Sequence, residues 1–402
     1  MKLGYVIGLA TLLLLGIALG YGLGSSFPTH TVEVTKLITS IKTDIKTFTL
    51  PTTVTITVVK TVSRTEFITF TSTTTSTSTI TERKVIIPQG NQLVIAWMLS
   101  TCDKSEWSVL ERFSRQIDIV SPDWYYLTED LSVGKYDKRC AEDREFIEFL
   151  NSLGVKLMPM LVSANSELVR KLVTDPNAID SLSAELVYLA KKYNYYGYNI
   201  DFEVSIPEYS TEFASFIDRL AKKLHSNGLI LTVDVPAKRM EWPSSYTATY
   251  DYAKLGKTEV DAVIIMAYDF YEWVSGPKPV APIWWVEDCV RYALQYIPPE
   301  KLILGIPNYG KTWSVDGTFR GWLLYPDWLA LIEKSGKNYT IDKELMEKVL
   351  ELNNEVAYFV DGEMGYYRAF IAVKYELKGI AVWRLDKGDP NAWSFYARAL
   401  GK

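Results

Sequence analysis

Three polar residues alternate along one short apolar segment of the chain. The segment 196–203 contains Asn199, Asp201 and Glu203, with Ile200 and Phe202 between them. Successive side chains of a strand point to opposite faces, so the polar trio would share one face and the apolar pair the other. The α-carbons of Asp201 and Glu203 would then lie about 6.6 Å apart. Two carboxyls this close disfavour double ionisation, so one of them should keep its proton to higher pH.

A carboxyl that stays protonated near neutral pH has the property that a general acid needs. Burying two carboxyls on one strand face is costly unless they are used or paired. The pattern therefore has two interpretations. Asp201 and Glu203 form an acid–base site, or they form a structural pair that arginine, lysine or tyrosine side chains satisfy.

The counts of other reactive residues favour carboxylate chemistry. The 402-residue chain has two histidines, His30 and His225, and a histidine-rich zinc site or a Ser-His-Asp triad would have to rest on them. His225 falls at a polar helix end, where we expect a solvated residue. The body contains no glycine-rich phosphate loop, so we expect neither a metal nor another cofactor. The net charge of −5 gives no reason to expect nucleic acid as a partner.

The elements that must position the carboxyls alternate between strands and helices. Eight runs rich in valine and isoleucine predict strands at Leu93–Met98, Ile117–Val120, Val155–Val162, Tyr198–Glu203, Ile230–Pro236, Ala262–Tyr268, Leu302–Asn308 and Gly379–Trp383. Amphipathic stretches between them predict helices at Ser105–Arg115, Glu142–Leu153, Ser181–Tyr193 and Thr211–Ser226. Eight such units fit an α/β fold, a closed (β/α)8 barrel, with an open doubly wound sheet as the alternative.

An insertion between the seventh and eighth strands is expected at about 311–360, where Trp328–Glu333 and Lys343–Leu352 have helical patterns. In such a barrel Ile200 and Phe202 would face the surrounding helices. Asn199, Asp201 and Glu203 would point into the barrel, each nearer to its C-terminal mouth than the one before. Barrel enzymes place their catalytic groups at that mouth.

Two segments precede the barrel, which we place at residues 85–402. Residues 1–24 include an uncharged stretch that would be about 33 Å long as a helix, enough to cross a membrane. It predicts an N-terminal transmembrane anchor, with a cleaved signal peptide as the alternative. Lys2 precedes the stretch, which would place its start in the cytoplasm and the rest of the chain outside.

Residues 25–84 form a Thr/Ser-rich segment that predicts an extended extracellular stalk. Two patterns in it leave other structures open. A heptad-like stripe allows weak self-association, and its members are Val34, Ile38, Ile41, Ile45 and Phe48. Alternating Val54, Ile56 and Val58 have a strand pattern.

The carboxylate segment resembles the signature of glycoside hydrolase family 18, Asp-Gly-x-Asp-x-Asp-x-Glu on the fourth barrel strand. Gly197, Asp201 and Glu203 match it, whereas Tyr196 and Asn199 replace two of its acids. The resulting Asn-Ile-Asp-Phe-Glu is similar to the branch of spore-cortex and peptidoglycan-type N-acetylglucosaminidases. Three further segments resemble family patterns at strands six, seven and eight: 266–269 (Met-Ala-Tyr-Asp), 305–310 followed by Trp313, and 379–385.

This resemblance implies an extracellular, membrane-anchored glycosidase that cleaves β-linked N-acetylglucosamine polysaccharides, chitin or peptidoglycan-like. Glu203 would be the general acid and then the base. The 2-acetamido oxygen of the substrate would be the nucleophile, which gives retention through an oxazolinium ion. Asp201 would orient the acetamido N–H and Tyr268 would hydrogen-bond the acetamido oxygen.

The resemblance also implies substrate-binding residues. Asp269 would bind sugar hydroxyls, and Trp383 would stack under the sugar at the cleavage site. Tyr309, in the strand-seven pattern, and Asn199 are further candidates. Among other aromatic residues, Trp273 and Trp284 are candidate subsite residues, although most aromatic residues in a body of this size belong to the core.

At positions 196 and 199 this chain lacks an acid of the family signature, and we expect different effects from the two replacements. Asn199 cannot ionise, so Asp201 would lose a carboxylate partner inside the barrel and stay anionic more readily. The replacement at Tyr196 should affect the structure near the start of the strand and not the catalytic chemistry. A surface lectin that binds the same glycans without turnover, and a structural envelope protein, are the alternative functions.

The three cysteines allow one pairing in an extracellular protein. Cys102 and Cys140 follow the first two predicted strands and could form a disulfide, which would leave Cys289 as a buried thiol on a helix.

Overall fold

The computed structural model describes residues 31–36, 54–62, 64–72, 88–99, 101–241, 246–270 and 276–402. The chain divides into two compact units, residues 1–85 and 86–402. The predicted membrane segment lies outside the described residues. Among the residues that are described, no helix combines the length and the apolar character needed to cross a membrane.

The first unit contains a three-stranded sheet. Strand β1 (Thr31–Lys36) runs parallel to β2 (Val54–Val62), which pairs antiparallel with β3 (Arg64–Ser72). Val54, Ile56 and Val58 therefore lie in a strand, as their alternation predicts. Val34, the first residue of the heptad-like stripe, also lies in a strand rather than a helix, because β1 pairs with β2 along its length. The other members of that stripe lie outside the described residues.

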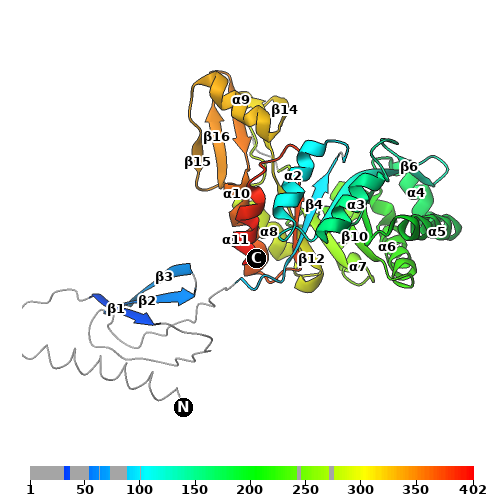
Figure 1. The fold of residues 1–402 in the computed structure, drawn as a ribbon, viewed down its shortest axis with the longest axis horizontal. Helices are drawn as coiled ribbons and strands as arrows, with labels where there is room; N and C mark the ends of the chain where they lie inside the picture. The colour runs from blue at the N-terminus through cyan, green and yellow to red at the C-terminus, as the bar shows by residue number, and fades with distance from the viewer. Residues whose placement is uncertain are drawn as a thin grey trace, which may run out of the picture. The chain divides into compact units, whose positions relative to one another are not determined.

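The second unit is a closed barrel of eight parallel strands, which confirms the predicted α/β barrel (Figure 1). The strands follow one another around the barrel in chain order, and β18 pairs with β4 to complete the ring. They are β4 (Leu93–Met98), β5 (Ile119–Leu127), β8 (Met160–Ser163), β9 (Gly197–Phe202), β10 (Ile230–Pro236), β11 (Ala262–Met266), β12 (Leu302–Pro307) and β18 (Gly379–Trp383). Two short strands, β6 (Val133–Lys135) and β7 (Lys156–Leu157), pair with β5.

Helices cover the outside of the barrel (Figure 1). They are α2 (Lys104–Phe113), α3 (Arg144–Leu153), α4 (Ser166–Thr174), α5 (Pro176–Tyr193), α6 (Ser210–His225), α7 (Tyr252–Leu255), α8 (Ile283–Ala293), α10 (Gly362–Lys374) and α11 (Ala392–Leu400). Local sequence sets their ends. Asp143 caps the start of α3 by accepting from the N–H of Glu145, and Gly154 ends it with a φ of 72°, a conformation that glycine adopts without strain.

Two apolar layers form the core of the barrel. A small cluster inside the barrel includes Ile95, Met160 and Ile264, and a larger one lies between the strands and the helices. Ile200 and Phe202 belong to the outer layer, and the ring of Phe202 stacks on Phe216 of α6 at 5.8 Å. The predicted orientation of β9 is therefore correct, with its polar residues facing inward.

The insertion between β12 and β18 contains an antiparallel sheet in the order β14-β13-β17-β16-β15. Its strands are β13 (Gly310–Ser314), β14 (Phe319–Leu323), β15 (Thr340–Asp342), β16 (Glu347–Glu351) and β17 (Glu355–Phe359). Helix α9 (Tyr325–Ser335) packs on this sheet and contains the predicted helical stretch at Trp328.

The predicted helix at Lys343–Leu352 is wrong, because the stretch is a turn followed by β16. Its residues are mainly good helix formers, which explains the expectation. In the folded chain the stretch lies between β15 and β17 and pairs with both, and Val349 and Leu350 are buried. Tertiary pairing therefore outweighs local propensity here.

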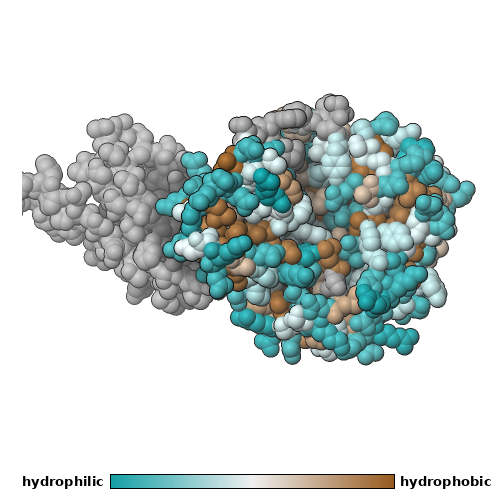
Figure 2. All heavy atoms as spheres, turned by 90° about the horizontal axis from the view of Figure 1, so that it is seen from above, coloured by the Kyte–Doolittle hydropathy of each residue, from teal (hydrophilic) through white to brown (hydrophobic). Residues whose placement is uncertain are grey.

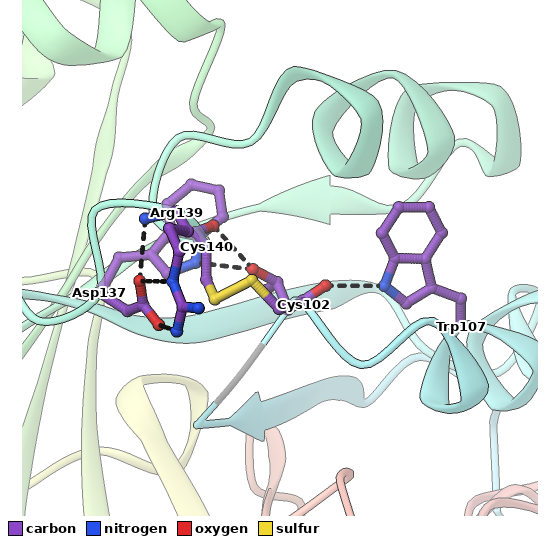
Figure 3. The surroundings of a disulfide bond; sticks show 7 residues. Cys102, Trp107, Asp137, Arg139 and Cys140 are labelled. Carbon is purple, nitrogen blue, oxygen red and sulfur yellow. Dashed lines mark hydrogen bonds and ion pairs between the residues drawn. A yellow bond between two sulfur atoms is a disulfide. The ribbon is translucent and has the colours of Figure 1, made fainter.

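A disulfide joins Cys102 and Cys140, as the sequence allowed (Figure 3). It links the loop after β4 to the loop before α3. Neighbouring hydrogen bonds hold the first loop as well: the hydroxyl of Thr101 donates to the carbonyl of Cys140, and the indole of Trp107 donates to the carbonyl of Thr101, each at 2.9 Å. Cys289 lies buried on α8, outside the disulfide.

Candidate active site

A cleft of about 540 Å³ opens over the C-terminal ends of the barrel strands. Its lining includes six of the predicted site residues: Asp201, Glu203, Tyr268, Asp269, Tyr309 and Trp383. On the face shown in the space-filling view, hydrophobic residues lie in several patches among mostly hydrophilic surroundings (Figure 2). The cleft thus combines aromatic surfaces with carboxyl groups, as sugar sites do.

Glu203 follows the last residue of β9, and its backbone N–H donates to the carbonyl of Ser163 on β8 at 2.9 Å. Its side chain is exposed to the cleft. Partial burial in the cleft raises the pKa of Glu203, and the negative charge of Asp269 raises it further. Glu203 therefore keeps its proton to higher pH than an ordinary glutamic acid, which is the property of a general acid.

Asp201 lies deeper than Glu203, with 8% of its surface exposed. Burial raises the pKa of Asp201 well above its ordinary value, and the charges of Glu203 and Asp123 add to the effect. The side-chain oxygen Oδ1 of Asp201 has no hydrogen-bond partner within the described part of the chain. Asp201 lines the cleft, so a substrate bound there would lie next to this unpartnered acceptor.

Asn199 removes one possible carboxylate partner, but Asp201 still has acidic neighbours in the barrel. The expectation that Asp201 stays anionic more readily than beside an acid at position 199 stays a prediction. Asp234 on β10 supplies a second carboxyl in the same part of the barrel, and Asp123 on β5 supplies a third. Burial raises the pKa of Asp123 to about 7. Several carboxyls in a space with little water favour protonation of some of them.

Asn199 itself lies below the cleft and does not line it. Its side chain is fully buried, and its Oδ1 accepts a hydrogen bond from the indole of Trp97 at 2.9 Å. The predicted role of Asn199 in substrate binding is therefore not supported, because the residue sits one pleat deeper in the barrel than Asp201. Tyr196, at the foot of the same strand, is exposed and remote in depth from the mouth.

Tyr268 and Asp269 follow β11 at the mouth of the barrel. Burial raises the pKa of the Tyr268 phenol well above its ordinary value, so the phenol remains a hydrogen-bond donor. Asp269 has a left-handed φ of 58°, which aspartate tolerates better than most residues. It forms an ion pair with Lys311 at 2.8 Å and accepts a hydrogen bond from the Tyr309 hydroxyl.

The three tryptophan candidates lie in different parts of the chain. Trp383 ends β18 and packs edge to face on Trp97 at 6.2 Å, so two indoles lie at the base of the cleft. Trp284 is exposed on α8, where Arg239 lies over its ring, and it does not line the described cleft. Trp273 lies outside the described residues.

Several lining residues were missed by sequence reasoning. Trp322 on β14 is 57% exposed, lies in the cleft and contacts the ring of Tyr309 at 5.5 Å. Nothing in its local sequence marks it, because its position depends on how the insertion folds. Asp234 was detectable, since it is an acid at an alternating position of an otherwise apolar strand.

No metal centre is indicated by the described residues, in which no group of three or more potential ligands is close enough to hold an ion. His225 is away from the cleft, on the outside of the barrel, where its Nε2 contacts Asp261 at 2.8 Å.

Comparisons with known proteins agree with this geometry. The family model for glycosyl hydrolases family 18 matches residues 146–388. An uncharacterized glycosylase, YvbX, from Bacillus subtilis is 28% identical over 245 residues, which cover 57% of this chain and 68% of the relative. The cortical fragment-lytic enzyme of Bacillus anthracis is 25% identical over 241 residues, and the match spans 55% of that enzyme.

Among solved structures, a chitinase from Chromobacterium violaceum superposes with a TM-score of 0.69 at 25% sequence identity. The superposition covers 77% of this chain and 99% of that chitinase. The barrel, the cleft at its mouth and the family match thus point to one conclusion. The chain belongs to glycosyl hydrolases family 18 and is a chitinase-like glycoside hydrolase.

Proposed function

We propose that the protein hydrolyses β-linked N-acetylglucosamine polysaccharides with retention of configuration, through substrate-assisted catalysis. The observation that carries this proposal is the placement of Glu203, Asp201 and Tyr268 around one cleft at the barrel mouth. Glu203 keeps its proton to higher pH than an ordinary glutamic acid, and the Tyr268 phenol keeps its proton more strongly than an ordinary tyrosine. Asp201 has an oxygen without a hydrogen-bond partner among the described residues.

In the proposed reaction Glu203 donates its proton to the glycosidic oxygen as the bond to the anomeric carbon breaks. The carbonyl oxygen of the substrate's 2-acetamido group attacks the anomeric carbon and forms the oxazolinium ion. Asp201 accepts a hydrogen bond from the acetamido N–H, and Tyr268 donates one to the acetamido oxygen. Glu203, now a carboxylate, takes a proton from a water molecule, whose oxygen bonds to the anomeric carbon as the bond from the acetamido oxygen to that carbon breaks. This step restores both the acid and the acetamido group.

The aromatic floor of the cleft would hold the sugar during these steps. Trp383 offers an indole at the base of the cleft, held edge to face by the buried Trp97, and Trp322 offers an exposed ring on the insertion side. Asp269, fixed by Lys311 and Tyr309, would receive sugar hydroxyls. Chitinases and cortical fragment-lytic enzymes both occur among the similar proteins, so chitin oligosaccharides and peptidoglycan fragments are the substrates to test first.

We further propose that the barrel acts outside the cell, carried on the threonine-rich segment and anchored by residues 3–24. The absence of charge in that stretch and the Cys102–Cys140 disulfide support this proposal, because disulfides persist in oxidising surroundings.

Replacing the general acid tests the proposed function. Glu203→Gln keeps the size of the side chain but has no proton to donate, so kcat on chitooligosaccharides should fall by a factor of about 10² to 10⁴. Affinity for the same oligosaccharide, measured by calorimetry, should stay within a few-fold of the original.

Mass analysis of the products separates the remaining outcomes. Unchanged turnover by Glu203→Gln would refute the acid assignment. Binding of oligosaccharides by the unaltered protein, with no reducing ends released, would instead favour the lectin alternative.

A further inference from the structure

Asp234 is a buried carboxyl that the proposed mechanism does not use. It lies on β10 with 2% of its surface exposed, and its Oδ1 has no hydrogen-bond partner in the described residues. An ionised carboxylate in such a place is costly unless it is neutralised. The position of Asp234 at the base of the cleft therefore needs a physical explanation.

The strand register places Asp234 beside Asp201. β9 and β10 pair in parallel with Thr232 opposite Asn199, so two residues further along, on the same inward face, Asp234 lies alongside Asp201. Neighbouring strands are about 4.8 Å apart. Gly197 allows this approach where the pairing begins, since a β-carbon there would lie 2.2 Å from the carbonyl oxygen of Ile230.

Both carboxyls line the cleft, and each has an oxygen without a hydrogen-bond partner among the described residues. We propose that Asp234 and Asp201 form a carboxyl pair that holds one proton between them, with Asp234 acting as the positioning residue for Asp201. This inference rests on the proposed function, because Asp201 is the group that would contact the substrate's acetamido N–H.

The groups around the pair favour a shared proton. The titratable groups around the pair are Glu203, which follows β9, Asp123 on β5, Tyr268 after β11, and three further tyrosines. These are Tyr136, Tyr246 and Tyr250, and every group in the set is acidic or neutral. Neither member of the pair forms an ion pair within the described part of the chain. Burial raises the pKa of Asp234 well above its ordinary value, and the charge of Asp201 raises it further. In the proposed pair, Asp234 holds the proton when Asp201 is anionic.

A shared proton lets Asp201 change charge without exchanging a proton with solvent. The O–H bond at Asp201 breaks and an O–H bond forms at Asp234, so the total charge of the pair is unchanged. Asp201 is then the anion that faces the positive charge of the oxazolinium ion. Asn199, on the same face of β9, has no acidic proton and cannot perform this transfer.

Moving the carboxyl between strands tests the pair. In Asp234→Asn the amide gives Asp201 a weaker hydrogen bond than a carboxyl O–H gives, because O–H···O⁻ bonds are among the strongest. The buried anion of Asp201 is then less stable, and the acid limb of the kcat/KM profile should move to higher pH by about one unit or more. In Asn199→Asp/Asp234→Asn, a carboxyl on β9 replaces the lost one, and the acid limb should return toward its original position.

Thr232→Val is the matched control for disturbance of β10. Thr232 faces the same interior two residues before Asp234 and is equally buried, but it carries no charge. Its pH profile should superimpose on that of the unaltered protein. A profile of Asp234→Asn that also superimposes, or that moves to lower pH, would overturn the proposal. So would a double variant that behaves like Asp234→Asn alone.

The pH dependence of thermal stability gives a readout that needs no activity. A carboxyl whose pKa is raised by folding binds its proton more tightly in the folded state, so its contribution to stability is complete below the unfolded pKa of about 3.9 and is lost as pH rises through the folded pKa. Asp234→Asn removes this loss. The melting temperature of Asp234→Asn, taken relative to that of the unaltered protein, should therefore rise steadily as pH rises above about 4.

The difference in melting temperature between Asp234→Asn and the unaltered protein could instead stay constant from pH 4 to 8. That result would contradict a retained proton, whether or not the protein hydrolyses glycans. If the unaltered protein hydrolyses no glycan, the proposed function fails, and the melting profiles still decide whether the pair holds its proton.

Discussion

At the scale of single residues, the cleft separates its acidic groups by depth. Glu203 meets solvent at the mouth, whereas Asp201 and Asp234 are nearly inaccessible below it. Depth determines how strongly burial raises each pKa. It is consistent with the proposed mechanism, in which the exposed acid donates the proton and the buried acids stabilise charge. Tyr268 stands between these levels with its phenol protonated.

Tyr268→Phe removes one hydroxyl and leaves the ring that packs on Tyr309 at 6.1 Å. If the phenol donates to the acetamido oxygen as negative charge moves from it, kcat should fall by a factor of about 10² to 10³, as for other donors of this kind. The measurement is steady-state hydrolysis of a chitooligosaccharide, with circular dichroism as the check on folding. A loss confined to KM would assign Tyr268 to binding alone.

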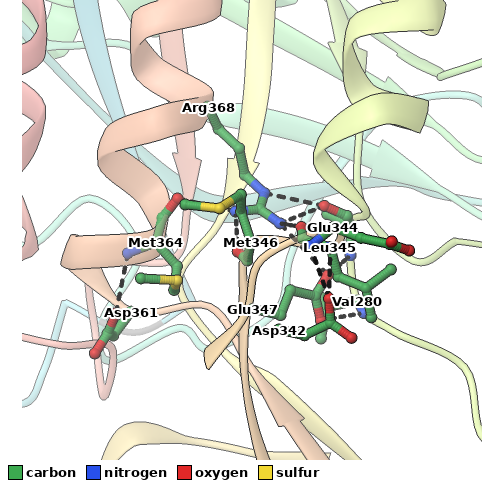
Figure 4. Close-up of polar contacts among 10 residues, drawn as sticks. Val280, Asp342, Glu344, Leu345, Met346, Glu347, Asp361, Met364 and Arg368 are labelled. Atoms are coloured by element: carbon green, nitrogen blue, oxygen red, sulfur yellow. Dashed lines mark hydrogen bonds and ion pairs between the residues drawn. The ribbon is translucent and has the colours of Figure 1, made fainter. Parts of the chain in front are cut away.

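At the scale of elements, the insertion completes the cleft that the barrel begins. Strand β13 brings Lys311 to Asp269, and β14 brings Trp322 to the cleft, with the Lys311 ammonium 4.8 Å from the centre of the Trp322 ring. The insertion is fastened to the barrel by Arg368 of α10, which is fully buried and contacts Glu347 of β16 (Figure 4).

The same guanidinium donates to backbone carbonyls on either side of it, including those of Ala281 and Met346. Glu347 in turn accepts from the N–H groups of Val280 and Ala281. The loop before α8, the insertion and α10 therefore meet at one buried ion pair.

Glu347→Ala would leave the Arg368 charge buried without its counterion, so it should lower the free energy of unfolding by about 3–5 kcal/mol. Asp180→Ala is the matched control, because it breaks an ion pair with Arg219 in which both side chains are about half exposed and should cost less than about 1 kcal/mol. Urea denaturation measures both. Equal losses in the two variants would show that the buried pair does not fasten the insertion.

At the scale of the whole molecule, the chain combines a barrel unit with a preceding unit of different composition. The barrel has its own core and its own disulfide, and the unit boundary at residue 85 lies before its first strand. Catalysis and attachment can therefore be assigned to separate parts of the chain.

Deleting residues 1–24 tests the proposed attachment. An uncharged stretch long enough to cross a bilayer should hold the full chain in the membrane fraction, and the shortened chain should lose that association. Fractionation followed by carbonate extraction makes the distinction. Full-length protein that appears in the soluble fraction would contradict a retained anchor and leave cleavage as the explanation.

The sequence by itself determined the fold class, the eight barrel strands and the acids on β9. These follow from local patterns: apolar runs at regular intervals predict the barrel, and alternation within Asn199–Glu203 determines which side chains face its interior. Short-range periodicity is sufficient because each strand must bury its own apolar face.

The tertiary structure alone decided which distant residues meet. Asp234 is 33 positions from Asp201 along the chain, and only the pairing of β9 with β10 makes them neighbours. Trp322 reaches the cleft because the insertion folds as a sheet, in which β16 forms a strand against its helical propensity. Burial, which sets the pKa of each acid, likewise depends on the packing of the whole barrel and not on local sequence.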